Sequence, residues 1–177
     1  MASDEEYLLM FYKKIKIVPV SISYEYDPTD MLKMPQLMAK ANDEIYIKEK
    51  NEDFMTLISG IMGQKKRIHI HVGDILEKEL DKIAEEQDNQ NKQIQALAQV
   101  IDDSILTTYK LWPTNYIAYD LLNNTTQFSS HYTEKEKLLF ERRLEMRIDI
   151  ENRILREGLL AMYANPVVNK MKYENAV

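Results

Sequence analysis

The sequence predicts an α/β fold in which two strands near the N-terminus are followed by a helix-rich C-terminal half. Two short segments show the residue alternation of strands, Ile15–Tyr24 and Arg67–Val72. Later segments repeat apolar residues at helical spacing, and Gln90–Tyr109 does so most regularly. At 177 residues, the chain is long enough to bury a core of its own.

The first element is expected to be a helix over Asp4–Lys14, because Ser3 and Glu6 form a capping-box pattern. This helix leads into the strand Ile15–Tyr24. Because side chains alternate along a strand, the larger ones share one face and the serines share the other. The first face carries Val18, Val20, Ile22 and Tyr24, and the second carries Ser21 and Ser23. Pro19 has no backbone N–H to donate, so we expect it at an edge, at a bulge or at the start of the strand.

Most of the remaining elements are predicted to be helices that begin at recognisable caps. One follows Asp30, and another runs from Asn51 to Gly63. Pro113 is predicted to open a further helix, in the position where its missing N–H costs nothing. A single last helix is predicted from Thr133, with apolar residues at helical spacing, namely Phe140, Leu144, Ile148, Leu155 and Leu159.

Two strands are too few for a parallel sheet with helices on both faces. We therefore expect a partner chain, or the rest of a larger domain, to contribute further strands. Residues 1–86 are predicted to form the strand-containing part, and residues 87–177 a helical region packed on it. If the chain stands alone, apolar surface should be exposed near Val18–Tyr24, because a strand of this kind normally has neighbours.

Composition excludes several classes of function. A net charge of −6 argues against a nucleic-acid partner. The chain has no cysteine, so disulfides, thiolate zinc sites and cysteine nucleophiles are excluded. No stretch approaches the ~20 apolar residues of a membrane-spanning helix. The expected location is the cytoplasm, either free or peripherally on the inner face of the membrane.

Two segments resemble a known family. Ile17–Pro28 reads IVPVSISYEYDP and is similar to the Pro-Val/Ile-Ser-Ile-Ser-Tyr-Glu/Asp block of the glycerolipid acyltransferases. Tyr109–Leu122 reads YKLWPTNYIAYDLL and resembles a bacterial branch of glycerol-3-phosphate and 1-acylglycerol-3-phosphate acyltransferases. The resemblance implies that the chain is the C-terminal part of an acyltransferase-type α/β domain.

The resemblance also implies a reaction and a binding region. The reaction is acyl transfer in phospholipid synthesis, from acyl-CoA or an acyl carrier protein to glycerol phosphate or a lysophospholipid such as lysophosphatidate, with no bound cofactor. The residues implied to border the acceptor site are Val18, Pro19, Val20, Ser21, Ser23 and Tyr24. A serine hydroxyl there could donate to a glycerol or phosphate oxygen, and packing in a core is the alternative.

The catalytic features of the family have no counterpart before Ile17. These features are a His-x4-Asp pair and a Pro-Glu-Gly-type block that holds the acceptor phosphate, so no catalytic residue is assigned. His69 and Asp74 have the same spacing, but they lie downstream of the strand block, and a structural strand histidine is the alternative. His131, with Glu134 and Glu136 nearby, offers no matched ligand set together with the strand histidines, so no metal site is predicted.

Three hypotheses for function remain open. The first is a fragment or C-terminal part of an acyltransferase. The second is a non-catalytic interaction module that complements a separately encoded catalytic half or forms a homo-oligomer. The third is a hydrolase built on His69 and Asp74.

Two further groups of side chains have two interpretations each. The basic run Lys65–Arg67 could attract a phosphate or complement a helix C-terminus. Three methionines could line an acyl groove or pack in the core, namely Met31, Met34 and Met38.

Overall fold

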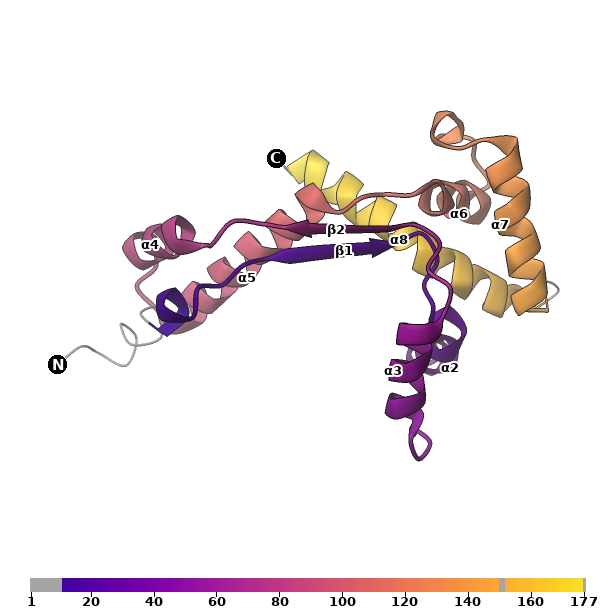
Figure 1. Cartoon of the computed structure of the whole chain (residues 1–177), viewed down its shortest axis with the longest axis horizontal. Coiled ribbons are helices and arrows are strands. Elements are labelled where there is room, and N and C mark those ends of the chain that lie inside the picture. Colours follow the sequence, from indigo (N-terminus) through magenta and orange to yellow (C-terminus); the bar gives the residue numbers. More distant parts are fainter. Residues whose placement is uncertain (1–10, 150–151, 177) are drawn as a thin grey trace. The chain divides into compact units, whose positions relative to one another are not determined.

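The computed structural model describes residues 11–149 and 152–176 (Figure 1). The predicted helix Asp4–Lys14 falls largely outside these residues, and residues 11–15 are helical. The elements that follow are β1 (Val20–Tyr24), α2 (Asp30–Ala41), α3 (Glu52–Met62), β2 (Ile68–Val72), α4 (Glu77–Glu86), α5 (Gln90–Thr108), α6 (Pro113–Asn123), a 3-10 turn η1 (Ser129–His131), α7 (Glu134–Arg147) and α8 (Arg153–Ala176).

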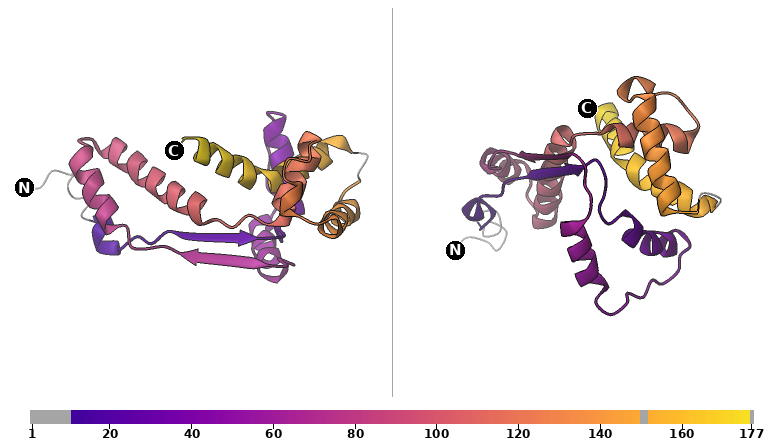
Figure 2. Two further views of the ribbon diagram at one scale, coloured as in Figure 1. Left: turned by 90° about the horizontal axis from the view of Figure 1, so that it is seen from above. Right: turned by 45° about the vertical axis from the view of Figure 1, so that its right-hand side comes forward.

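The predicted α/β class is wrong, and so is the predicted C-terminal part of an acyltransferase-type α/β domain. The structure is mostly helical, with 66% helix and 6% strand. Within the described residues, β1 and β2 form a two-stranded sheet and pair only with each other. The strands run in opposite directions, as Figure 2 shows, so they need no crossover helix and create no parallel sheet for helices to cover.

The described chain divides into two units. The first contains residues 11–23 together with His69–Lys110, and therefore α4, α5 and most of the antiparallel pair β1–β2. We call this pair the hairpin, and its two strands are joined through α2 and α3 and not by a tight turn. The small core of this unit lies between α4 and α5. It is formed by Leu76, which precedes α4, by Leu80 and Ile83 of α4, and by Leu97 of α5. The amphipathic spacing of Gln90–Tyr109 is thereby confirmed as a helix, which ends one residue earlier, at Thr108.

The second unit contains Tyr24–Ile68 and Leu111–Asn175. It holds the larger core, in which residues from α2, α6, α7 and α8 meet, including Met34, Ile117, Phe140, Leu160 and Ala164. The rings of Phe140 and Tyr163 meet edge to face, with centroids 5.2 Å apart. Helix α6 begins at Pro113, as predicted.

The single helix predicted from Thr133 is in fact two helices, α7 and α8. Its start is confirmed, because the Glu136 backbone N–H donates to Thr133 Oγ1 over 3.2 Å and the Thr133 N–H donates to Glu136 Oε2 over 2.9 Å. After Arg147, Ile148 adopts an extended conformation, while its side chain stays buried. The apolar spacing continues across the break, so it gave no sign of the interruption.

Candidate functional site

The predicted acceptor-binding region lies on the hairpin. The Gly73 N–H donates to the Pro19 carbonyl over 2.9 Å, and this bond sets the register. Val20 then lies opposite Val72 and Ile22 opposite Ile70. Because strand side chains alternate, these four residues share one face, which we call the outer hairpin face. All four are between 44% and 65% exposed.

The opposite face of the hairpin carries small and polar residues. Ser21 and Ser23 are buried, and the register places them opposite His71 and His69. The Thr108 hydroxyl of α5 donates to Ser21 Oγ over 3.0 Å. In most antiparallel sheets the apolar side chains face the core and the polar ones face solvent, and in this pair of strands the arrangement is reversed. The prediction of exposed apolar surface near Val18–Tyr24 is confirmed, since Val18, Val20 and Ile22 are all exposed.

The six predicted acceptor-site residues do not share one surface. Val18 and Val20 are exposed, Pro19 is buried, and Tyr24 is half-buried with Lys65 Nζ 5.9 Å from its ring centre. Ser21 is held by Thr108, whereas Ser23 Oγ has no hydrogen-bond partner in the described structure. Both serines are buried, so neither hydroxyl lies at the surface where it could meet a ligand.

His69 and Asp74 are not assembled as a pair. His69 Nδ1 is buried and has no hydrogen-bond partner among the described residues. Asp74 instead lines a cavity of about 370 Å³ with His71, Glu79 and Ser104. Two carboxylates make this cavity unfavourable for a phosphate. The described residues contain no group of three or more histidine, aspartate or glutamate side chains placed to hold a metal ion.

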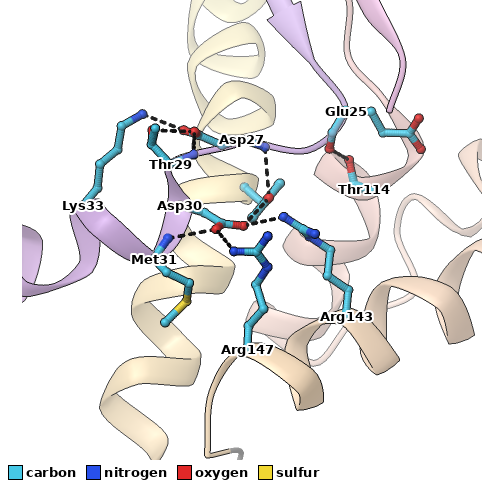
Figure 3. Close-up of polar contacts among 10 residues, drawn as sticks. Glu25, Asp27, Thr29, Asp30, Met31, Lys33, Thr114, Arg143 and Arg147 are labelled. Carbon is cyan, nitrogen blue, oxygen red and sulfur yellow. Dashed lines mark hydrogen bonds and ion pairs between the residues drawn. The ribbon is translucent and has the colours of Figure 1, made fainter. Parts of the chain in front are cut away.

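A buried polar network lies in the second unit, around the carboxylate of Asp30 (Figure 3). Asp30 is fully buried and accepts hydrogen bonds from Arg143 Nη2 at 2.8 Å, Arg147 Nη1 at 2.6 Å and the Tyr163 hydroxyl at 2.9 Å. Burial of the Tyr163 hydroxyl, together with the charge of Asp30, raises the pKa of Tyr163. Burial alone would lower the pKa of Arg143, but Tyr163 and Asp30 outweigh it and raise that pKa.

A second buried carboxylate, Glu25, explains two of the three residues in the basic run. Lys66 Nζ donates to Glu25 Oε1 and Arg67 Nε to Glu25 Oε2, each over 2.6 Å. Lys65 Nζ donates to the carbonyls of Ile61 and Gly63 at the end of α3. The helix-terminus explanation therefore holds for Lys65, whereas Lys66 and Arg67 have a different partner, the Glu25 carboxylate.

The Glu25 cluster predicts a dependence of stability on pH. Burial raises the pKa of Glu25, but the hydrogen bonds from Arg67 and Lys66 outweigh it and lower that pKa overall. A lowered pKa means that the folded state favours the carboxylate, so the stabilisation is present above the unfolded pKa and is lost as pH falls through the folded one. We expect the urea midpoint to decrease as the pH is lowered below about 4.5, the ordinary pKa of a glutamate side chain. The decline should be shallower in Glu25→Gln, and an equal slope in both proteins would contradict the assignment.

Sequence reasoning missed both carboxylate clusters. The sequence pattern identified Asp30 only as part of a helix cap. Its partners Arg143 and Tyr163 lie 113 and 133 residues further along the chain. The available signal was the position of two arginines one turn apart, at 143 and 147, on a helix that also carries the apolar residues Phe140 and Leu144. That spacing places both guanidinium groups on one side of α7.

Comparison with known proteins gives no relative from which a role could be transferred. No family model, curated protein or solved structure matches the chain. No helix in the described residues is both long and apolar enough to cross a membrane.

Proposed function

We propose that this chain acts in acyl transfer to glycerol phosphate or lysophosphatidate as a non-catalytic part that a separate catalytic polypeptide completes. One observation carries the proposal, the exposure of the outer hairpin face while the serines on the other face are buried. The segments Ile17–Pro28 and Tyr109–Leu122 provide the link to glycerolipid chemistry through their resemblance to that family.

An exposed apolar face on a paired hairpin favours association. Fully burying one valine or isoleucine side chain gains roughly 1.5–3 kcal/mol, and the outer hairpin face offers four such residues, each still about half exposed. Neither strand contributes a charged residue to this face, so an apolar helix or sheet layer can cover it without burying an unpaired charge. The proposed partner therefore contributes an apolar layer.

The partner would also supply the catalytic groups. Transfer to a hydroxyl needs a general base, and His69 and Asp74 are not arranged as one. The cavity at Asp74 repels phosphate, so recognition of the acceptor phosphate is assigned to the partner as well. The acyl donor would be acyl-CoA or an acyl carrier protein. A peripheral position on the inner face of the membrane belongs to this proposal, because lysophosphatidate resides in the membrane.

A complementation assay tests the proposal. The purified chain is mixed, in detergent, with a separately produced acyltransferase polypeptide that carries the His-x4-Asp pair and is inactive by itself. Release of free thiol from acyl-CoA is followed with glycerol 3-phosphate or lysophosphatidate as acceptor. We expect no acceptor-dependent release from either polypeptide alone and clear release from the mixture.

Two variants with equally exposed isoleucines provide the control. Ile70 on the outer hairpin face is 59% exposed and Ile154 on α8 is 60% exposed. Ile70→Asp should abolish the gain in thiol release, because it places a charge in the proposed interface, whereas Ile154→Asp should retain it. Release by the chain alone that disappears in His69→Ala would overturn the proposal, as would a mixture no more active than its parts.

A further inference from the structure

The two strands of the hairpin differ in exposure, and β2 is the outer one. Every residue of β2 except the half-buried His69 is exposed, whereas β1 carries two buried serines. In the left-hand view of Figure 2, β1 lies between α5 and β2, and the Thr108 hydroxyl of α5 donates to Ser21 of β1 over 3.0 Å. Within the described residues β2 pairs only with β1, so its other edge has no neighbouring strand there.

The register of the hairpin determines which backbone groups of β2 reach this free edge. At one end the Gly73 N–H donates to the Pro19 carbonyl over 2.9 Å, and at the other end the Glu25 N–H donates over the same distance to the carbonyl of residue 67. The odd-numbered residues of β2 therefore bond to β1, and the residues between them turn their N–H and C=O groups the opposite way. The groups at the free edge belong to Ile68, Ile70 and Val72. Another extended strand can pair with this whole row.

Strand β2 lacks the features that normally keep edge strands from pairing. Natural edges are protected by charged side chains, prolines or bulges. Strand β2 reads IHIHV, without a lysine, arginine, aspartate, glutamate or proline. Its register with β1 is the same at Gly73 and at Arg67, so no bulge interrupts the ladder between them. Two copies of a chain with net charge −6 can therefore meet at this edge without bringing like charges together near neutral pH.

The sequence of β2 is complementary to itself. When two antiparallel copies are centred on Ile70, this residue lies opposite its own counterpart, Ile68 lies opposite Val72, and His69 lies opposite His71. Each match joins side chains of the same kind, and β-branched pairs stabilise an antiparallel ladder. The same centre satisfies the backbone, because the three residues at the free edge are then the ones that exchange hydrogen bonds, about six in all. A shift by one residue would lose both agreements.

We propose that the free edge of β2 pairs with the same edge of a second copy of this chain, antiparallel and centred on Ile70. The two hairpins then form one four-stranded sheet in the order β1–β2–β2–β1, with a twofold axis at its centre. Strand β1 is not the pairing strand, because a strand added beside it would have to fit against α5, which already holds Ser21. The contact uses an edge of the sheet and not the outer hairpin face, so it goes beyond the proposed function and does not require acyl transfer.

Disulfide cross-linking tests the register directly, because the chain has no cysteine of its own. Ile70→Cys should link to a second copy under mild oxidation, since paired α-carbons lie about 5.5 Å apart, within the range that a disulfide spans. Val72→Cys and Ile68→Cys should not link to themselves, because equivalent residues would lie roughly 14 Å apart, but a mixture of the two should link. Ile154→Cys, at 60% exposure against 59% for Ile70, measures random collision. Ile70→Cys should link at least about tenfold faster than this control.

Sedimentation equilibrium of the full chain measures association without a cross-link. We expect a weak dimer whose fraction rises with protein concentration, because a five-residue strand from each copy makes a small interface. Ile70→Pro removes the central N–H from the free edge of β2 and should give a monomer. Ile22→Pro is the matched control, since it removes an N–H from the opposite edge of the hairpin and should still dimerise. Circular dichroism establishes that both variants keep their helices, and the cross-linking result decides by itself if either does not.

Four results would overturn the proposal. They are a monomer at every concentration, association of a folded Ile70→Pro equal to that of the unaltered protein, Ile70→Cys linking no faster than Ile154→Cys, and Val72→Cys linking to itself as fast as Ile70→Cys. The last result would indicate that two outer hairpin faces pack together. No catalytic polypeptide is present in these measurements, so they are independent of the outcome of the complementation assay.

Discussion

Asp30→Asn is expected to lower the free energy of unfolding by about 3–5 kcal/mol, the cost of removing one partner from a buried ion pair. The carboxylate of Asp30 is the common acceptor for Arg143, Arg147 and the Tyr163 hydroxyl. Arg143 is itself buried, so without Asp30 its charge remains in the core with no counter-ion. The side-chain amide of asparagine keeps the volume but neither the charge nor the second acceptor oxygen.

Urea denaturation at neutral pH measures this effect, and Asp53→Asn is the matched control. Asp30 and Asp53 both occupy the first turn of a helix, so both complement the helix dipole. The side chain of Asp53 is 81% exposed and forms a surface ion pair with Lys48, so its replacement should cost far less. A double variant, Asp30→Leu with Arg143→Met, should recover part of the loss, because it removes the stranded charge. Equal losses in Asp30→Asn and Asp53→Asn would show that the buried network contributes nothing specific.

Local structure followed from the sequence wherever the determining residues are close together in the chain. The capping box at Thr133 and Glu136, the start of α6 at Pro113 and the amphipathic helix α5 all depend on contacts within a few residues. The break after Arg147 could not be predicted in this way. Ile148 is apolar, buried and correctly spaced for a helix, but its backbone is extended. Burial in a tertiary core determines that position, and no local signal reports it.

The predicted fold class was wrong because the sequence does not show which strands pair with each other, and a parallel sheet was assumed. A run of valine and isoleucine is typical of a strand buried on both faces, and this suggested a parallel sheet. In the structure, the same residues lie on the outer face of an antiparallel pair and are exposed. The pattern of alternation was correct, but it does not specify which face is buried. That information resides in contacts such as the one between Ser21 and Thr108, which are far apart in sequence.

The candidate site was predicted only in part for the same reason. Sequence resemblance directed attention to Ile17–Pro28, and the hairpin there has the unusual exposed face on which the proposal depends. The carboxylate clusters at Glu25 and Asp30 were not anticipated, although both lie in or next to that segment. Their partners come from Lys66, Arg67 and α7, and only the folded chain brings them together.

Phe140→Ala is expected to destabilise the protein by about 3–5 kcal/mol, the usual cost of removing a phenylalanine from a packed core. The side chain of Phe140 is completely buried among residues of α6 and α8, and its ring meets that of Tyr163. Its loss leaves a cavity and removes the packing that orients the Tyr163 hydroxyl toward Asp30. The urea midpoint should therefore fall, and the Arg143–Asp30–Tyr163 network should loosen with it.

Phe54→Ala is the matched comparison, because it removes the same side chain from an exposed position. Phe54 on α3 is 60% exposed, so the substitution should change the urea midpoint very little. Its cost comes from surface area alone, whereas Phe140→Ala also leaves a cavity among α6, α7 and α8. A loss of stability in Phe54→Ala comparable with that in Phe140→Ala would contradict the assignment of Phe140 to the main core.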